Sequence, residues 1–124
     1  MSSDRQQYAA QILTLYRRTP GVVAVRRADR RLAAELHDRR VPLDLIEAAL
    51  LLASVRRIFR PRDASPLTPV ATLYYFLPVI DELRATPPEP GYLAYLRHKL
   101  TAVAPDFIAA LDHRIARMDG HQKA

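Results

Sequence analysis

Histidine, serine and carboxylate side chains are the groups of this chain that could perform acid-base or nucleophilic chemistry, but their spacing forms no catalytic pattern. The histidines at 37, 98, 113 and 121 never occur in the i, i+4 spacing with which a helix presents two ligands to zinc. Asp112 and His113 are adjacent, and adjacent side chains on a helix diverge too far to act together. No serine lies in a Gly-x-Ser-x-Gly elbow. We therefore expect no catalytic residue, no metal site, no cofactor and no enzyme activity.

Arginine is the residue type whose distribution indicates binding. Residues 1–62 hold thirteen arginines and six acids, a net charge of +7, whereas residues 63–124 hold six basic residues and seven acids, a net charge of −1. Such an asymmetry indicates a polyanionic partner, because clustered cations displace counterions from a phosphate backbone. The planar guanidinium also grips phosphate with two parallel hydrogen bonds. Arginine outnumbers lysine 17 to 2 along the whole chain, so genome base composition is an alternative explanation.

The arginine doublets differ in how well a structural role explains them. Arg17-Arg18, Arg39-Arg40 and Arg56-Arg57 are expected near helix carboxyl ends, where cations interact favourably with the helix dipole by about 0.3 to 1 kcal/mol. A different group straddles a loop and the start of a helix, where the dipole disfavours positive charge. These first-choice binding residues are Arg26, Arg27, Arg30 and Arg31, and a second patch is expected at Arg56, Arg57, Arg60 and Arg62.

The composition is that of one folded domain spanning residues 1–124. The chain is 49% hydrophobic and 26% charged, which is close to the average of globular proteins. It has no cysteine, and its amino terminus lacks the basic and apolar pattern of a signal peptide. The longest apolar run, residues 43–53, contains Asp44 and Glu47, so no membrane span is expected. We predict a cytoplasmic protein that does not associate with membranes.

Apolar spacing predicts helices that make this an all-α protein, a single compact bundle of five to six helices. Ser3 and Gln6 have the spacing of a capping box for the first helix, and Asp29 is a candidate cap for the second. Pro78 should kink the fourth helix or delay its start to about Tyr75. VVAV at 22–25 reads as an extended connector or a short strand. The expected helices cover residues 4–18, 30–40, 42–59, 69–85, 92–100 and 105–119, with residues 1–3 and 120–124 frayed.

Residues 30–58 have the length and order of a helix-turn-helix. The second of these helices would open with Leu43, Asp44, Leu45, Ile46 and Glu47, and acids and large apolar groups there oppose insertion into a DNA groove. We therefore expect phosphate contacts to predominate over base readout, with low sequence specificity.

The succession PLDLIEAALLLA, a proline-bearing loop and TLYYFLPVIDEL resembles the DnaD-like domain of primosome and phage replisome-organiser proteins. The resemblance covers residues 43–83, about a third of the chain. It implies an all-α, non-enzymatic accessory factor of replication or of a mobile element that binds DNA and partner proteins. Leu83 replaces the family's tryptophan and Pro78 interrupts the helix, so an aromatic contact with DNA is not implied. The positions that match the family's Tyr-Ile-x-x-Ile-Leu-x-x-Trp helix are Tyr75, Phe76, Val79, Ile80 and Leu83.

Tyr74, Tyr75 and Phe76 form a run of three aromatic residues that is interpreted first as part of the core. Three consecutive side chains on a helix cannot all face the same way, so at least one should lie near the surface. The sequence predicts a small basic helical accessory protein whose function is to bind nucleic acid, with DNA preferred to RNA as the ligand. The alternative is a protein-interaction adaptor or a self-associating helical bundle, that is, a protein partner or a homo-oligomer.

Overall fold

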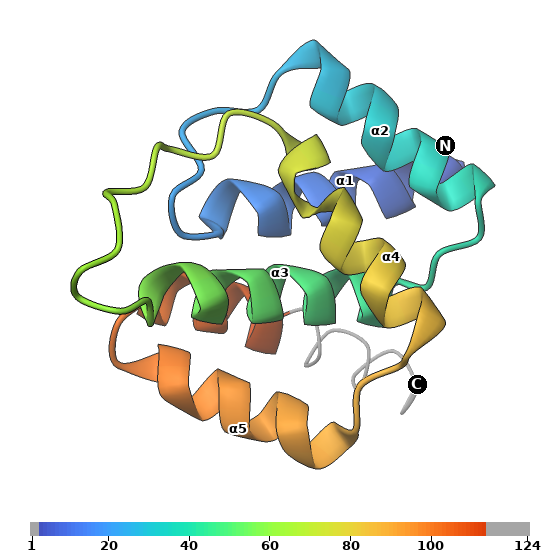
Figure 1. The fold of residues 1–124 in the computed structure, drawn as a ribbon. Coiled ribbons are helices and arrows are strands. Elements are labelled where there is room, and N and C mark those ends of the chain that lie inside the picture. The colour runs from blue at the N-terminus through green and yellow to red at the C-terminus, as the bar shows by residue number, and fades with distance from the viewer. Residues whose placement is uncertain (1–2, 114–124) are drawn as a thin grey trace.

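Helix α3 (Leu43–Ile58) runs through the middle of the computed structural model, which describes residues 3–113 (Figure 1). Its side chains from Ala48 to Val55 are all buried, as expected for a helix packed on several sides. The described residues contain no strand, and the one bridge, between Val22 and Val70, is isolated. The prediction of an all-α bundle is confirmed. The other elements are α1 (Asp4–Arg18), α2 (Arg27–Asp38), η1 (Leu73–Phe76), α4 (Leu77–Ala85), α5 (Pro90–Thr101) and a further helix over residues 105–113.

Local signals set the starts of several helices. The Gln6 N–H donates to Ser3 Oγ at 3.1 Å, and the Ser3 N–H donates to Gln6 Oε1 at 2.9 Å, which confirms the capping box of α1. Ser3 is thus the N-cap of α1, although residues 1–3 were expected to fray. Pro42 is the N-cap of α3, and Pro90 is the first residue of α5. Proline fits such positions because the first N–H groups of a helix have no partner inside it.

The helices predicted over residues 30–40 and 69–85 begin at other residues than expected. Helix α2 starts at Arg27 and ends at Asp38, so the predicted range of 30–40 was wrong at both ends, and Asp29 is its third residue rather than its cap. The predicted helix over 69–85 is a 3-10 turn, η1, followed directly by α4. Pro78 is the second residue of α4, where a missing N–H costs nothing, so it does not kink the helix. The alternative of a delayed start is confirmed, because α4 begins only at Leu77, close to the predicted Tyr75.

The aromatic run at the start of this segment is divided between core and surface. Phe76 is 0% exposed and meets Tyr16 edge to face, with ring centroids 6.1 Å apart. Tyr74 and Tyr75 are each 44% exposed. The interpretation of all three as core residues was therefore wrong for the two tyrosines, and the expectation of at least one surface aromatic is confirmed.

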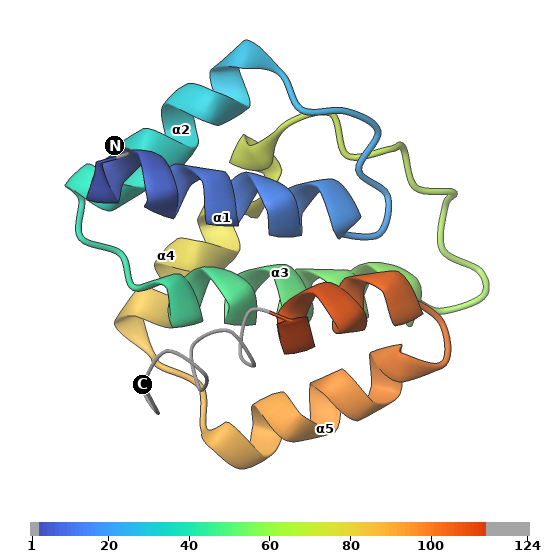
Figure 2. The same cartoon turned by 180° about the vertical axis from the view of Figure 1, so that it is seen from behind.

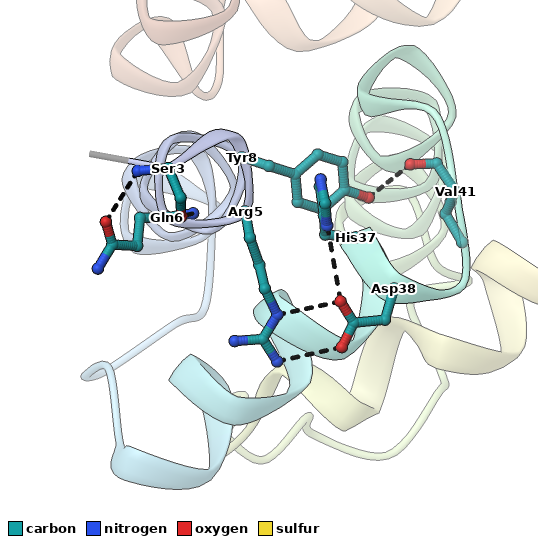
Figure 3. A network of polar contacts seen from close by, with 7 residues as sticks. All are labelled: Ser3, Arg5, Gln6, Tyr8, His37, Asp38 and Val41. Atoms are coloured by element: carbon teal, nitrogen blue, oxygen red, sulfur yellow. Dashed lines mark hydrogen bonds and ion pairs between the residues drawn. The ribbon is translucent and has the colours of Figure 1, made fainter. Parts of the chain in front are cut away.

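Helices α1 and α2 are joined at the amino end of α1 by a polar network (Figure 3). The Tyr8 hydroxyl donates to the Val41 carbonyl at 2.5 Å, and its ring meets His37 edge on at 5.3 Å. Arg5 forms two hydrogen bonds with Asp38, at 3.0 and 3.1 Å, and this guanidinium lowers the pKa of the Asp38 carboxyl. Both partners are half exposed, so the pair orients the helices more than it stabilises them.

The two helices that could form a helix-turn-helix do not pack as a pair. Helix α2 packs on α1 and η1, whereas α3 packs on α1, α4, α5 and η1. Both views show α2 crossing α1 on the side away from α5 (Figures 1 and 2). Because α3 is enclosed by its neighbours, it cannot act as an exposed recognition helix.

The last predicted helix is described over residues 105–113, with Phe107, Ile108 and Leu111 buried as expected. Ile115, Met118 and Gly120, which were assigned to the same helix, lie outside the described residues, as do residues 1–2 and 121–124. Among the described residues, no helix combines the length and the apolar character needed to cross a bilayer.

Two tyrosines of α1, the buried Tyr16 and the partly buried Tyr8, make the stability of the fold sensitive to alkaline pH. Burial raises the pKa of Tyr8 and of Tyr16 to about 12, against an ordinary value near 10. Below pH 10 both hydroxyls are protonated in the folded and the unfolded chain, so their contribution is fully present; it is lost as the pH rises toward 12. We expect the free energy of unfolding, from urea titrations followed by circular dichroism, to fall over this range.

Tyr16→Phe should make that fall shallower, because one fewer proton is released on unfolding. The Tyr16 hydroxyl is buried without a hydrogen-bond partner in the described chain, so its removal should leave stability at neutral pH unchanged or raise it by about 1 kcal/mol. This account would be contradicted if the unfolding free energy of the variant fell as steeply above pH 10 as that of the wild type, or if the variant were clearly less stable at neutral pH.

Candidate functional site

Asp29 is a buried carboxylate that joins the start of α2 to the start of η1. The residue is 0% exposed. Its Oδ2 accepts the Arg26 N–H at 2.9 Å, while Oδ1 accepts the Thr72 hydroxyl at 2.9 Å and the Leu73 N–H at 2.8 Å. Each carboxylate oxygen therefore receives at least one donor, which is the condition for burying a charge. The first turn of α2 is fixed against η1 by these bonds.

The first-choice arginines all lie on the part of α2 that Asp29 fixes. Arg26 is the N-cap, Arg27 is the first helical residue, and Arg30 and Arg31 follow within the next turn. All four side chains are exposed. Among residues 3–113 none of them forms an ion pair, so their charges are not neutralised by carboxylates of the described chain. The structure brings them together as the sequence predicted.

The second predicted patch is divided by the geometry of α3. Arg56 forms two hydrogen bonds with Glu82 of α4, at 2.8 and 3.1 Å. These bonds raise the pKa of Arg56 and lower that of Glu82. The charge of Arg56 is thus matched by a carboxylate. Arg57, one residue further along the helix, points in a different direction and has no acidic partner in the described part.

Arg57 is held by neutral acceptors. Its Nη2 donates to the Thr68 carbonyl at 2.9 Å, its Nη1 lies 3.5 Å from the Tyr75 hydroxyl, and its guanidinium carbon is 5.5 Å from the centre of the Tyr75 ring. Gly21 lies against the same group: a Cβ at this residue would come within 2.8 Å of Nη2, and its φ of +86° also favours glycine. Arg57 is therefore immobilised while its positive charge remains uncompensated.

Arg60 is held in a similar way, since its Nη1 donates to the Ser65 carbonyl at 2.6 Å. Arg62 is exposed and forms no ion pair within the described chain. A hollow of about 250 Å³ lies beside these residues. The side chains that line it are Ala53, Arg56, Arg57, Arg60, Leu67, Tyr75 and Val79.

The two arginine groups lie on either side of η1, and together with Arg17 and Arg18 we call them the arginine end. Here the segments that follow α1 and α3 touch: the Val70 N–H donates to the Gly21 carbonyl at 2.7 Å. Between the groups lies η1, tied to Asp29 on one side and to Arg57 on the other. Both views place the carboxyl ends of α1 and α3 and these two segments together (Figures 1 and 2). The arginine end comprises Arg17, Arg18, Arg26, Arg27, Arg30, Arg31, Arg57, Arg60 and Arg62.

Apart from Arg56 and Glu82, the arginine–carboxylate pairs lie elsewhere on the described surface. Asp38 pairs with Arg5, and Glu35 lies 3.8 Å from Arg39, both at the opposite end of α2. Arg97 and Asp112 form a further pair on the far side of α3. The acids of α2 that could have neutralised the first-choice arginines are thus engaged at the other end of the helix.

The sequence interpretation missed Asp29 as part of this site and did not single out Tyr75, which lines the hollow. Asp29 was expected only to cap its own helix, because its bonds to Thr72 and Leu73 span more than forty residues. The run of three aromatic residues was the one available signal for the tyrosines, and it did not tell which of them would be exposed.

The site has the chemistry of anion binding. Guanidinium groups donate hydrogen bonds and carry charge, but they neither accept protons near neutral pH nor act as nucleophiles. Within residues 3–113 no cluster of three histidine, aspartate or glutamate side chains could hold a metal ion. No protein-family model, curated protein or solved structure matches the chain. The resemblance to the DnaD-like domain therefore stays a prediction.

Asp29→Ala tests the anchor of the site. The substitution leaves the Leu73 and Arg26 N–H groups without their acceptor in a buried place, so it should lower the free energy of unfolding by roughly 3 kcal/mol. Urea denaturation measures the loss. Asp38→Ala, which removes an exposed carboxylate, is the control and should have a much smaller effect. Equal losses in the two variants would show that Asp29 is not the anchor.

Proposed function

We propose that this protein is a small accessory factor that binds nucleic acid through the arginine end, mainly by phosphate contacts. The observation that carries the proposal is the group of exposed arginines on the first turns of α2, which have no carboxylate partner in the described chain. Clustered guanidinium groups without counterions are the usual means of binding a phosphate backbone. Arg57 and Arg60 add positive charge from a distant part of the chain.

The energetics of α2 support a binding role for these arginines. The amino end of a helix carries partial positive charge, so cations there are unfavourable by about 0.3 to 1 kcal/mol. Arg26, Arg27 and Arg30 occupy this end nonetheless. Asp29 supplies one negative charge at the same turn, which reduces the repulsion but does not remove it. Folding alone therefore gives no reason for the cluster, whereas an anionic ligand does.

Low sequence specificity follows from the same arrangement. Helix α3, which would read bases in a helix-turn-helix, is enclosed by its neighbours, so we expect the exposed arginines of α2 to act mainly on phosphate. Contacts with phosphate fix position without reading sequence. The resemblance to the DnaD-like domain adds an association with replication or a mobile element, with DNA preferred to RNA as the ligand. The cytoplasmic location is the one expected from the composition of the sequence.

Replacing Arg26, Arg27, Arg30 and Arg31 together by Gln tests the proposal. The affinity for oligonucleotides should fall, and the slope of its logarithm against the logarithm of salt concentration should decrease by roughly three, since about one counterion is released per phosphate contact. Fluorescence anisotropy over a salt series measures both quantities. The melting temperature should stay the same or rise, because unfavourable charges leave the amino end of α2.

The matched control changes four other arginines to Gln: Arg5, Arg39, Arg40 and Arg84. It removes the same amount of charge, but from the end of the molecule where α1 begins and α2 and α4 finish (Figure 1). Its salt slope should stay close to that of the wild type. Wild-type binding that does not depend on salt, or equal losses in the two quadruple variants, would refute a specific role for the arginine end.

The alternative of a protein-interaction adaptor has its own observation, an exposed aromatic face on α5 and the end of α3. Phe59, Tyr92 and Tyr95 are each more than 40% exposed, and the Lys99 ammonium lies 4.3 Å from the centre of the Phe59 ring. Grouped aromatic side chains on a surface are typical of protein interfaces. The apolar helix α3 is used within the core of one chain.

On this alternative the chain self-associates through the aromatic face. Sedimentation over a concentration series should then give a dimer mass, and Tyr95→Glu should restore the monomer by placing a charge in the interface. Val23→Glu, at an exposed residue away from α5, is the control and should leave the dimer intact. A wild-type monomer at every concentration would remove self-association from consideration.

A further inference from the structure

The hollow beside Tyr75 has the size and the lining of a site for one flat ring system. Its volume of about 250 Å³ is below the roughly 300 to 1,000 Å³ of pockets that enclose a whole drug-sized ligand. Ala53, Leu67 and Val79 give it an apolar floor. Tyr75 forms one wall, and its ring is held edge on against the buried Phe76 at 5.1 Å. The Arg57 guanidinium lies over one face of this ring, 5.5 Å from its centre, so a planar ligand meets an aromatic surface with a cation already beside it.

Two guanidinium groups at the rim keep donors available. Arg57 uses one N–H for the Thr68 carbonyl and a second for the Tyr75 hydroxyl, and Arg60 uses one for the Ser65 carbonyl. A guanidinium has five N–H donors, so each group retains at least three. Because all of these acceptors are neutral, both charges remain available to an anion. Arg56, whose charge is matched by Glu82, completes the wall without adding net charge.

An aromatic wall, an apolar floor and an anion-binding rim correspond to the parts of one nucleotide. We propose that the hollow receives an unpaired base of a single-stranded nucleic acid, packed against Tyr75, while Arg57 and Arg60 bind the adjoining phosphate. This inference rests on the proposed function and names its ligand more closely. Bases in a duplex are stacked and paired inside the helix, so only a single strand can place one in the hollow. The arginines of α2 would bind the phosphates on either kind of strand.

The position of η1 supports a continuous path for the strand. Tyr75 lies on the element that is bonded to Asp29 at one end, and Asp29 also holds the Arg26 backbone. The hollow and the arginines of α2 are thus attached to opposite sides of the same short turn. A strand with one base at Tyr75 can run its next phosphates past η1 toward the arginines of α2.

Tyr75→Ala is the central test, measured with the full chain against an oligo(dT) strand and a duplex of the same length. The affinity for the single strand should fall about 5- to 100-fold, as is typical for loss of one stacked base, whereas the affinity for the duplex should change less than about twofold. Tyr75→Phe keeps the ring and loses only the hydroxyl bonded to Arg57, so it should bind the single strand nearly as well as the wild type.

Tyr74→Ala is the matched control, because this neighbouring tyrosine is equally exposed but does not line the hollow. It should leave both affinities within about twofold of the wild type. An oligonucleotide with one 5-iodouracil supplies a direct readout: irradiation should crosslink it to Tyr75, as identified by mass spectrometry of the digested complex. Thermal denaturation of each variant shows whether the fold is retained.

The outcomes separate this inference from the function on which it rests. Binding of neither strand would overturn both. Salt-dependent binding of single strand and duplex that Tyr75→Ala leaves unchanged would overturn the base site and leave the phosphate-binding function standing. Equal losses for both strands in a folded Tyr75→Ala protein would also overturn it. If dTMP alone bound as tightly as the strand, the hollow would be a site for a free nucleotide and the inference would be wrong.

Discussion

The buried carboxylate of Asp29 is the interaction on which the arrangement of the surface depends. A carboxylate can be buried only where donors surround it, and its donors come from the start of α2 and from the start of η1. These two elements are far apart in sequence, so the bonds fix the first turn of α2 against the start of η1. The arginines of α2 and the exposed Tyr75 owe their relative positions to this one residue.

The second determinant is the kind of acceptor that each arginine has. A guanidinium bonded to a carboxylate, such as Arg56 with Glu82, loses its net field. A guanidinium bonded to backbone carbonyls, such as Arg57 or Arg60, is equally immobile but keeps its charge. Arg5 and Arg39 meet acids of α2 far from its first turn, whereas Arg56 meets Glu82 of α4 directly beside Arg57, which has only neutral acceptors. The fold thus leaves some arginines neutralised and others uncompensated, even where they are neighbours in sequence.

The features that could be predicted from the sequence are those with a local cause. The capping box of Ser3 and Gln6 lies within one turn, and the apolar character of α3 is visible in any window of its residues. The bonds of Asp29 and Arg57 are not visible in this way, because their partners lie in a distant loop and are largely backbone groups, which every residue has. Arg56 and Arg57 were assigned to one patch as neighbours in sequence; successive residues on a helix point in different directions, so they reach different partners.

The unpaired arginines of the arginine end repel one another, and this repulsion has to be limited for the protein to fold. Two helices, α1 and α3, finish there, and their free carbonyl groups carry partial negative charge toward Arg17, Arg18 and Arg57. At the amino end of α2, where the helix dipole disfavours cations, the negative charge is supplied by Asp29. Dipole fields fall off within about one helical turn, whereas the field of net charge extends over roughly a Debye length of 10 Å. The compensation therefore stabilises the folded chain at short range and leaves the positive potential that a polyanion would meet on approach.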